Sequence, residues 1–564
     1  MEGGAKRWHL PPPVEDRGLP RDLPPPMAKV LLTRGIDTAE KLRLFLEPPQ
    51  RLPYDPLRLA GMDRAVQRLH RAINRAERVG VFGDFDVDGV TGSAIVAEGL
   101  EPLGVPVVPY LPHRTEEGHG LSTPAVDHLV AQGVSLIITV DCGVTACDEV
   151  AYANRLGIDV IITDHHLPQS GLPDATAIID PVLPGGSYPF HDLCGAGLAF
   201  KLVQGIYEFH GQPWAKQLLE LAALGTIADQ VSMVDENRYL VQQGLAGLAQ
   251  TQRPGLQALY RLAGVDTAWL DAEALAFQVI PRLNSAGRMS HALDSYRLLT
   301  TTSSEEAGAL ADRLESLNLD RRELTERAVA MAREEVRNQS ASGELPAILL
   351  VAGQGITRGV AGLVAGRLAD TFHRPAVAMA AEDGYLVGSG RSIPEFDLFK
   401  AFTGCQDLFV RFGGHSQAAG FTLATEKLPL LRERLTAAAD TALGSRDLSP
   451  TLDIDAEIGL AELTGDLVHW LSILKPFGPS NRQPVFLTRR THVLEARYMG
   501  KTGQHLRFKL REGNDEWPAV AFNQAERWVS GTPYVDLVYS VTIDRWRGME
   551  RLTLRVQDFR PVVG

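Results

Sequence analysis

The sequence is poor in the features that mark secreted and membrane proteins. It holds four cysteines in 564 residues (Cys142, Cys147, Cys194 and Cys405), and no two of them form a CxxC pair. No run of about 18 or more apolar residues is present, which argues against a transmembrane helix. The first residues, MEGGAKRWHLPPP, lack the apolar core of a signal peptide. We therefore expect a protein of the reducing cytoplasm whose thiols are free.

Positive charge is scarce as well. The formal net charge is −13, which argues against a chain that coats nucleic acid through its overall charge. The net charge varies along the chain, because residues 481–564 hold 14 Lys and Arg against 9 Asp and Glu. A nucleic-acid partner would have to be held by this basic tail and by local arginine clusters.

Apolar runs divide the long chain into several segments. Residues 1–60 are a proline-rich N-terminal extension with short helices, and residues 61–300 alternate apolar runs with helical segments. The runs are VGVFGDF (79–85), VPVVPYL (105–111), SLIITV (135–140) and DVIIT (159–163). They are short, continuous and β-branched, which is typical of a parallel sheet covered on both faces. The predicted fold class is α/β.

Three further segments follow. In residues 301–342, a capping box of Ser303 and Glu306 is followed by apolar residues that recur at intervals of three and four positions. This pattern predicts one long connecting helix. Residues 343–449 predict a smaller α/β companion domain. Residues 450–564 contain five strand-like runs, which indicate a small β-barrel of the OB type.

Acidic residues follow the apolar runs of the first α/β region. VGVF leads into GDFDVDG (83–89), SLIITV leads into Asp141, and DVIIT leads into Asp164. His165 and His166 come next, and Asp229 follows a helical stretch. Because ligands bind beyond the carboxyl ends of the strands in such sheets, we expect these side chains at one edge.

Metal binding competes here with simpler interpretations. Three carboxylates at every second position repel one another unless a cation lies between them. A solvated turn is one alternative, and a calcium loop fails because position 95 is Ile instead of Glu. Asp with His suits Mn²⁺, Zn²⁺ or Mg²⁺ and favours Mn²⁺. So many donors would serve two divalent ions that share a bridging carboxylate.

These motifs resemble the DHH phosphoesterase family. DHH stands at 164–166, with GDFDVDG and VDCG before it and GTIAD after it. GGHSQAAG (413–420) resembles the GGHxxAAG signature of the companion (DHHA1-type) domain of that family. With the long helix and the OB-like barrel, the pattern is similar to the bacterial single-stranded-DNA exonucleases of the family over roughly residues 60–560.

The resemblance implies an activity and a setting. The activity is 5′-to-3′ degradation of single-stranded DNA to mononucleotides, dependent on two divalent ions (Mn²⁺ preferred, or Mg²⁺), in DNA repair and recombination. The setting is the bacterial cytosol, associated with the nucleoid and with no membrane. Implied partners are single-stranded DNA, a single-strand-binding protein and a RecQ-type helicase. A cleft between two lobes of one chain predicts a monomer.

The resemblance also implies roles for residues. Asp141, as the bridging ligand, and His165 are catalytic through the metals, and His166 would face the scissile phosphate. Asp164 would orient a ligand. The metal ligands would be Asp84, Asp86, Asp88, Asp141, His165 and Asp229.

A second set of residues would bind phosphate. A pocket for the terminal phosphate explains 5′ polarity, because it would hold the strand end at a fixed distance from the metals. Each arginine in the set can alternatively be a surface residue or a structural ion pair. The candidates are Arg114, Arg282, Asn284, Arg288, Ser389, Arg391, Gly413, Gly414 and His415. The barrel would add Phe486, Arg489, Arg490, Arg497, Tyr498, Phe508 and Trp546, although its aromatics fit the barrel core better.

Two stretches depart from the family pattern, and they concern the expected DNA contacts and domain linkage more than the metal site. GITRG (355–359) lacks the Trp and His of the usual GWHxG, and PFGPSNRQPVF (476–486) departs from PFGxGNPxP. Apart from these departures, other functions stay open. One alternative is a phosphodiesterase of the same family that acts on short oligoribonucleotides or cyclic dinucleotides. Another is a DNA-binding scaffold without catalysis, and a third is an α/β protein with an incidental acidic edge.

Overall fold

The computed structural model describes residues 6–12, 18–46, 54–114, 116–168, 171–340, 344–444, 446–546 and 549–562, without the side chains of 544–550. The chain divides into two compact units. One runs from Leu52 to Leu448, and the other combines Gly4–Arg51 with Ser449–Gly564. The finer domain boundaries expected at 60, 300, 342 and 449 stay predictions.

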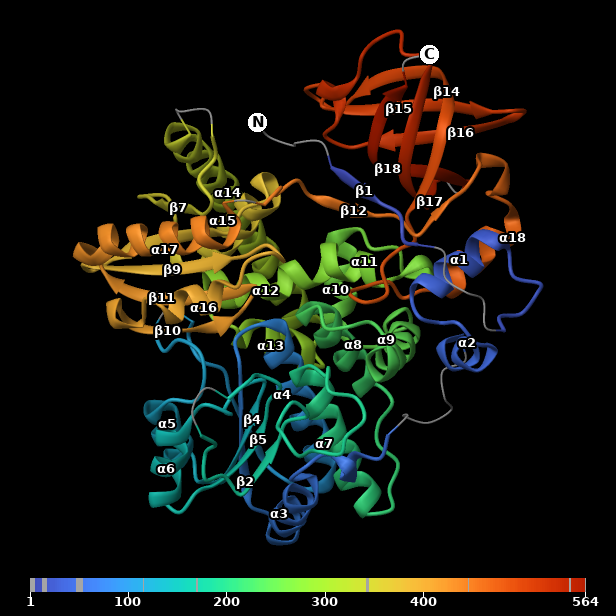
Figure 1. The fold of residues 1–564 in the computed structure, drawn as a ribbon. Coiled ribbons are helices and arrows are strands. Elements are labelled where there is room, and N and C mark those ends of the chain that lie inside the picture. Colours follow the sequence, from blue (N-terminus) through green and yellow to red (C-terminus); the bar gives the residue numbers. More distant parts are fainter. Residues whose placement is uncertain are drawn as a thin grey trace. The chain divides into compact units, whose positions relative to one another are not determined.

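A five-stranded parallel sheet forms the base of the first unit, as predicted (Figure 1). Its order is β3-β2-β4-β5-β6, so the carboxyl ends of all five strands meet at one edge. The strands are β2 (Arg78–Gly83), β3 (Val107–Tyr110), β4 (Val134–Val140), β5 (Asp159–Thr163) and β6 (Ala177–Ile179).

Helices cover both faces of this sheet because its strands are apolar on both sides. Val81 and Ile138 belong to the core under one layer, and Phe82 and Ile137 belong to the core under the other. The first layer contains α4 (Val87–Leu100) and α7 (Gly195–Phe209). The second contains α5 (Thr123–Ala131) and α6 (Cys147–Arg155).

A helical region extends the first layer. It contains α3 (Met62–Arg75), α8 (Leu218–Asp229), α9 (Asp235–Leu248), α10 (Pro254–Ala263), α12 (Ile280–Met289) and α13 (Leu293–Thr300). The connecting helix α14 (Ser304–Gln339) follows, and Ser303 Oγ accepts the Glu306 N–H at 3.3 Å, as the capping box predicts. Leu310 and Leu314 of α14 join the core of the parallel sheet, whereas Ala332 and Val336 join the core of the next domain.

The companion domain is a mixed sheet of order β10-β11-β9-β8-β7. Helix α15 (Arg358–Phe372) and the end of α14 cover one face, and α16 (Leu398–Thr403) and α17 (Leu428–Leu443) cover the other. The strands are β7 (Leu349–Ala352), β8 (Ala376–Glu382), β9 (Tyr385–Arg391), β10 (Phe409–His415) and β11 (Ala418–Ala424). The hairpin of β10 and β11 was not expected from the sequence.

The second unit is built around a closed barrel, which confirms the OB-like prediction. Its strands pair in the order β14-β15-β16-β18-β17, and β14 also pairs with β17. The strands are β14 (Phe486–Met499), β15 (His505–Glu512), β16 (Asp515–Ala521), β17 (Tyr534–Trp546) and β18 (Met549–Val562).

The N-terminal segment packs with this barrel, which the sequence did not predict. Met27 and Leu31 of α1 (Pro25–Thr33) lie in one core with Phe508 of the barrel. Strand β1 (Arg7–His9) pairs in parallel with β12 (Thr451–Asp453). Throughout the described parts of the chain, no helix has the length and apolar character needed to cross a bilayer.

Candidate active site at the acidic edge of the parallel sheet

The predicted acids meet at the carboxyl edge of the sheet. Asp84 directly follows β2, Asp141 follows β4 and Asp164 follows β5. Side chains of this edge form three groups of possible metal ligands. Within each group, one ligand atom from each residue lies within 4.8 Å of the others. The groups are Asp84, Asp86 and Asp141; Asp88, His165 and Asp229; and Asp141, His165 and His166.

Asp141 belongs to two of these groups and lies next to the third. Its backbone has a φ of 62°, a left-handed conformation that is uncommon outside glycine and is often found at functional sites. Its Oδ1 lies 3.0 Å from Nε2 of His165. The same nitrogen is 3.7 Å from Oδ2 of Asp229 and 4.0 Å from Oδ2 of Asp88. Four donors therefore converge on one small volume.

The start of α7 holds Asp88. Its carboxylate accepts the Gly195 N–H at 2.6 Å and the Ala196 N–H at 2.8 Å. A Cβ on Gly195 would lie 2.4 Å from Cβ of Asp141, and a Cβ on Gly225 would lie 2.7 Å from Oδ1 of Asp88. These contacts fix the acids from behind. These contacts were not predicted, although the small residues of CGAG (194–197) were a visible signal.

Asp164 orients the two histidines that follow it. Its Oδ2 accepts the Val144 N–H, and its Oδ1 accepts the backbone N–H groups of His165 and His166. Nδ1 of His166 lies 2.7 Å from the same Oδ1. Burial alone would lower the pKa of His166, but its hydrogen bond and charge interaction with Asp164 raise the pKa to about 9. The Nε2 side of His166 is left for another partner.

Crowding shapes the electrostatics of the edge. Burial, with Asp88 and then Asp86, holds the pKa of Asp141 well above its usual range. Burial, again with Asp88 and Asp86, raises the pKa of Asp229 to about 9. The negative charges therefore cost free energy unless a cation accompanies them.

The donor set fits divalent cations. Burial and the neighbouring His166 lower the pKa of His165, so its imidazole is neutral and able to bind a metal. Oδ1 of Asp84 is buried and finds no hydrogen-bond partner in the described parts of the chain. Carboxylates combined with one imidazole suit Mn²⁺, Mg²⁺ and Zn²⁺.

Arginines gather beside the acids. Arg114 lies over the ring of Phe85 at 4.6 Å, and its charge interacts with Asp84 and Asp86. Arg288, at the end of α12, interacts electrostatically with Arg114, Asp86 and Arg391, and burial with Arg114 lowers its pKa to about 9. Within the described residues, neither Arg114 nor Arg288 has an ion-pair or hydrogen-bond partner. Such a cluster is suited to an anion.

Two glycines of α15 allow close approach, one to the backbone of Arg288 and one to the side chains of Ser389 and Arg391. A Cβ on Gly359 would lie 2.3 Å from the carbonyl oxygen of Arg288. A Cβ on Gly362 would lie 3.1 Å from Ser389 Oγ and 3.3 Å from a guanidinium nitrogen of Arg391. Ser389 and Arg391 also contact each other, with Nη1 3.4 Å from Oγ. Gly359 belongs to GITRG, the stretch that departs from the family pattern.

Two of the predicted phosphate ligands have other partners. Arg282 forms an ion pair with Glu315 of α14 and donates to the Gln278 carbonyl, which is the structural role weighed for it. Oδ1 of Asn284 accepts the Val87 N–H at 3.1 Å, so Asn284 supports the start of α4. Their roles in phosphate binding gain no support from these contacts.

The GGHSQAAG motif forms the hairpin of β10 and β11. Gly413, Gly414 and His415 pair with Gly420, Ala419 and Ala418. Burial, Arg391 and His166 lower the pKa of His415, so this histidine lies within electrostatic reach of both the arginines and the DHH motif.

One residue near the metal edge was missed. His119 follows Glu116–Gly118 in the loop of Arg114, and its Nδ1 lies 3.3 Å from Oδ2 of Asp84. Its ring contacts Phe85, with the ring centres 4.3 Å apart. A histidine between two glycines, beside a predicted phosphate ligand, was the available signal.

The barrel corrects part of the expected strand-binding set. Phe486 and Phe508 are fully buried in its core and cannot stack on bases. Tyr498 is 57% exposed. Arg489 pairs with Glu457, Arg497 pairs with Glu495, and Arg490 lies over the ring of Tyr534. The side chain of Trp546 falls outside the described residues.

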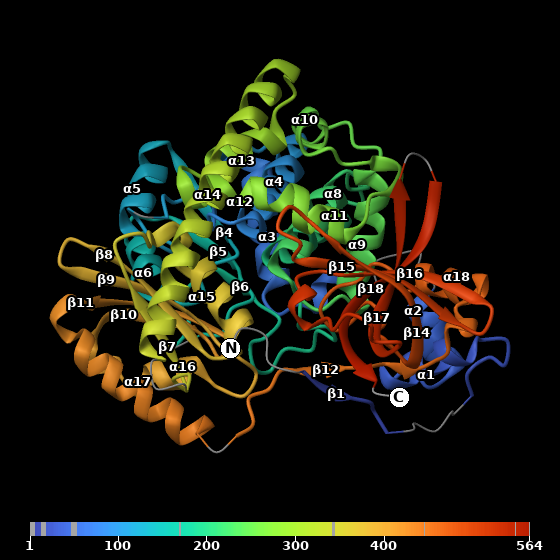
Figure 2. The same ribbon diagram turned by 90° about the horizontal axis from the view of Figure 1, so that it is seen from above.

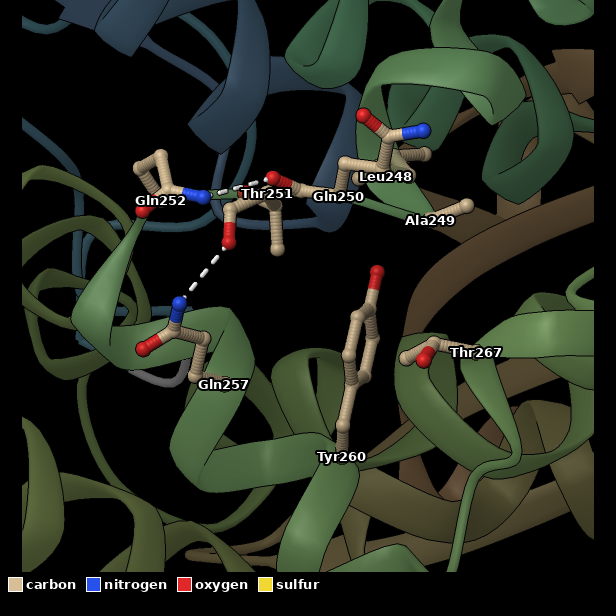
Figure 3. A pocket seen from close by; sticks show the side chains of 8 residues that line it. All are labelled: Leu248, Ala249, Gln250, Thr251, Gln252, Gln257, Tyr260 and Thr267. Carbon is tan, nitrogen blue, oxygen red and sulfur yellow. Dashed lines mark hydrogen bonds between the residues drawn. The ribbon is translucent and has the colours of Figure 1, made fainter.

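A separate hollow of about 310 Å³ lies where α9 meets α10 (Figure 3). Its eight lining residues are uncharged, among them Gln250, Gln252 and Tyr260. The amides of Gln252 and Gln257 donate to the backbone carbonyls of Gln250 and Thr251. It therefore offers a phosphate or a cation no charged partner.

Comparison with known families divides the chain into three matched regions. Residues 78–226 match the DHH family N-terminal domain, residues 345–441 the DHHA1 domain and residues 454–558 the RecJ OB domain.

Whole-chain relatives agree with this assignment. The single-stranded-DNA-specific exonuclease RecJ of Bacillus subtilis is 37% identical, with 99% of this chain and 71% of the relative covered. RecJ of Salmonella typhimurium is 35% identical, with 97% and 98% covered. The crystal structure of RecJ from Thermus thermophilus in complex with Mn²⁺ superimposes with a TM-score of 0.83 at 29% identity, covering 99% of this chain and 80% of that one. The Mg²⁺ complex of the same protein gives a TM-score of 0.78 at 28% identity, with 99% and 79% covered.

Proposed function

The chain belongs to the RecJ family of single-stranded-DNA-specific exonucleases, and from this membership we propose that it degrades single-stranded DNA from 5′ to 3′ into mononucleotides. One observation supports this most directly: Asp86 of the metal edge interacts electrostatically with both Arg114 and Arg288. A cation site therefore adjoins an anion site. A strand end has the complementary pattern, with a terminal phosphate one nucleotide away from the first linkage.

The metal-binding part of the proposal assigns two ions. Asp84, Asp86 and Asp141 would hold one, and Asp88, His165 and Asp229 would hold the other, with Asp141 bridging them. Mn²⁺ is the preferred ion and Mg²⁺ the alternative, because the set includes an imidazole. When bound, such ions stabilise the attacking and leaving oxygens and lower the pKa of water.

The side chains around the ions position the substrate. Asp164 holds Nδ1 of His166, which leaves Nε2 to donate to an oxygen of the scissile phosphate. Arg114, Arg288 and Arg391 would hold the 5′ phosphate, with Ser389 beside Arg391. A strand anchored in this way presents its first linkage to the metals, which accounts for the polarity.

The rest of the strand requires a further surface. The barrel has the OB fold, which binds single strands through a basic groove and stacking side chains. Tyr498 of β14 is its exposed aromatic candidate. A long polymer is therefore a better substrate for this chain than a dinucleotide.

The cellular role follows from the substrate. We place the protein in the bacterial cytosol at the nucleoid, acting as a monomer in repair and recombination. A RecQ-type helicase would supply single strands, and a single-strand-binding protein would keep them unpaired. Sedimentation of the purified chain tests the monomer, and co-sedimentation with each partner tests the two contacts.

The test of the activity uses single-stranded DNA labelled at the 5′ end in one reaction and at the 3′ end in another, with Mn²⁺. We expect the 5′ label to appear at once as mononucleotide while the 3′-labelled strand shortens gradually. A matched duplex should survive. If long strands survive and only oligonucleotides of about two to four residues are degraded, the substrate is a short oligonucleotide and the proposal is overturned.

A further inference from the structure

His119 lies at the metal edge but belongs to neither of the two proposed ligand groups. Its Nδ1 is 3.3 Å from Oδ2 of Asp84, which forms a group of carboxylates with Asp86 and Asp141. The other group contains an imidazole, that of His165. The carboxylate group therefore has a ring nitrogen beside it, as the second group has one within it.

The loop after β3 places His119 next to the acids. This loop leads into α5, which lies beside α6 (Figure 2). Gly118 and Gly120 flank the histidine with φ angles of 85° and 82°, in the left-handed region that favours glycine. The imidazole packs on Phe85, which is buried, with the ring centres 4.3 Å apart. The ring therefore has a firm support, and its Nδ1 lies on the side of Asp84.

The spacing between His119 and Asp84 suits two ligands of one ion. Neighbouring ligand atoms of an octahedral ion, each about 2.1 Å from the metal, lie about 3.0 Å apart. Nε2 of His165 and Oδ1 of Asp141, which are both in the proposed ligand set, have this spacing of 3.0 Å. The 3.3 Å between His119 and Asp84 is nearer to it than to the length of about 2.8 Å of a charge-assisted hydrogen bond.

The Asp84 side chain is fixed, whereas that of His119 can adjust. Asp84 is 5% exposed, and its backbone N–H donates to the Val140 carbonyl at 3.2 Å. Its Oδ1 is buried and finds no hydrogen-bond partner among the described residues, so this carboxylate requires a cation. The side chain of His119 is 71% exposed and is free to move by the few tenths of an ångström that a bound ion requires.

We propose that His119 is a ligand, through Nδ1, of the ion that Asp84, Asp86 and Asp141 would hold. The inference rests on the metal-binding part of the proposed function. Each of the two ions then has one imidazole among its ligands, His119 for the first and His165 for the second. An ion that accepts nitrogen, such as Mn²⁺, is therefore favoured over Mg²⁺ at both positions.

The difference between Mn²⁺ and Mg²⁺ is the measurable consequence. Mg²⁺ takes oxygen ligands and retains several waters, so the loss of a nitrogen ligand changes its binding little. Transition-metal ions bind imidazole more readily. Removal of the His119 nitrogen should raise the Kd of one of the two Mn²⁺ ions about tenfold and change the Kd of Mg²⁺ less than about twofold.

Metal binding to the full chain without DNA tests the inference. His119→Phe keeps a ring on Phe85 and removes Nδ1, and His128→Phe, the same change at an exposed histidine of α5, is the matched control. Calorimetric titration measures the Kd of Mn²⁺ and of Mg²⁺. Pulsed EPR of the Mn²⁺-loaded chain detects the nitrogen of each bound imidazole. We expect nitrogen couplings from two histidines in the wild type and in the control, and from one in His119→Phe.

The outcomes separate this inference from the proposed function. If two Mn²⁺ ions bind but only one histidine shows nitrogen couplings in the wild type, the inference is overturned and the exonuclease proposal is unaffected. Two histidines that persist in His119→Phe also overturn it, because His166, which is grouped with Asp141 and His165, would then be the second ligand. If no divalent ion binds, the metal part of the proposed function fails with it. If both ions bind as expected but no strand is cut, only the exonuclease proposal fails. His119→Asn replaces His119→Phe if that variant does not fold.

Discussion

We assign the acidic edge to the metals and the arginine cluster to the 5′ phosphate, and the two are built in opposite ways. The acids come from the ends of neighbouring strands in one sheet and are packed from behind by Gly195 and Gly225. The arginines come from a loop, from α12 and from β9, in two domains, and stand on long side chains. We therefore expect the first site, which is crowded with like charges, to be rigid. We expect the second, whose charges are carried by long side chains, to be adjustable.

The largest expected effect comes from removing the acid at the centre of the rigid site. Asp141→Asn should reduce exonuclease activity to background, as chelation with EDTA should in the wild type, because Asp141 belongs to the first metal group and lies 3.0 Å from His165 of the second. The same change should stabilise the metal-free protein, since it removes one of several repelling buried carboxylates.

Thermal unfolding with and without Mn²⁺ measures the second effect. A saturating ion stabilises the folded wild type by about 2.7 kcal/mol at a hundred times Kd. The variant should show a higher Tm without metal and a smaller rise with it. A lower Tm of the metal-free variant would contradict the inference that repulsion between the buried carboxylates destabilises the metal-free wild type.

The next effect tests how rigidly the acids are held. Gly195→Ala places a methyl group 2.4 Å from Cβ of Asp141 and 2.9 Å from Oδ2 of Asp88. We expect activity to fall by about 10- to 100-fold, as it does when groups that orient metal ligands are displaced. Gly308→Ala, a helical glycine with nothing within 4 Å of its would-be Cβ, is the control and should keep full activity. Equal activity of both variants would show that Asp141 and Asp88 can shift to accommodate the methyl group without loss of function.

A smaller loss is expected at the adjustable site. Arg288→Gln removes a guanidinium but leaves Arg114 and Arg391 near the phosphate. KM for a 5′-phosphorylated strand should rise about tenfold, the usual scale for one charged hydrogen bond, while kcat changes little. A strand with a 5′-hydroxyl should show almost no change in KM. A matching rise for both strands would mean that Arg288 does not recognise the terminal phosphate.

The same contrast explains what could be predicted from the sequence. Asp84, Asp141 and Asp164 were predictable as neighbours, because each follows an apolar run and parallel strands end at one edge. The two domains and the barrel followed from periodicity and the family motifs. Arg288 and Arg391 were named from motifs, but their meeting depends on Gly359 and Gly362, which show no pattern that distinguishes them from other helical glycines.

Other features depended wholly on tertiary packing. The N–H groups of Gly195 and Ala196 reach Asp88 across more than a hundred residues, as the 2.6 and 2.8 Å contacts show. Arg282 was a candidate for phosphate, yet the register of α12 on α14 pairs it with Glu315. Met27 joins the barrel core from the far end of the chain. Local propensity carries no information on such long-range contacts.

The smallest expected effect comes from making the same glycine-to-alanine change in the arginine site as at Gly195. It is the sharpest test of the difference in rigidity between the two sites. Gly362→Ala puts a methyl group 3.1 Å from Ser389 Oγ and 3.3 Å from the Arg391 guanidinium. Both atoms end side chains that can shift by a few tenths of an ångström, so KM for the 5′-phosphorylated strand should change less than about threefold. The residue lies inside α15, where alanine is favoured over glycine by about 0.5–1 kcal/mol, so chemical denaturation should show a gain in stability. A loss of activity as large as that of Gly195→Ala would mean that the arginines are held as rigidly as the acids.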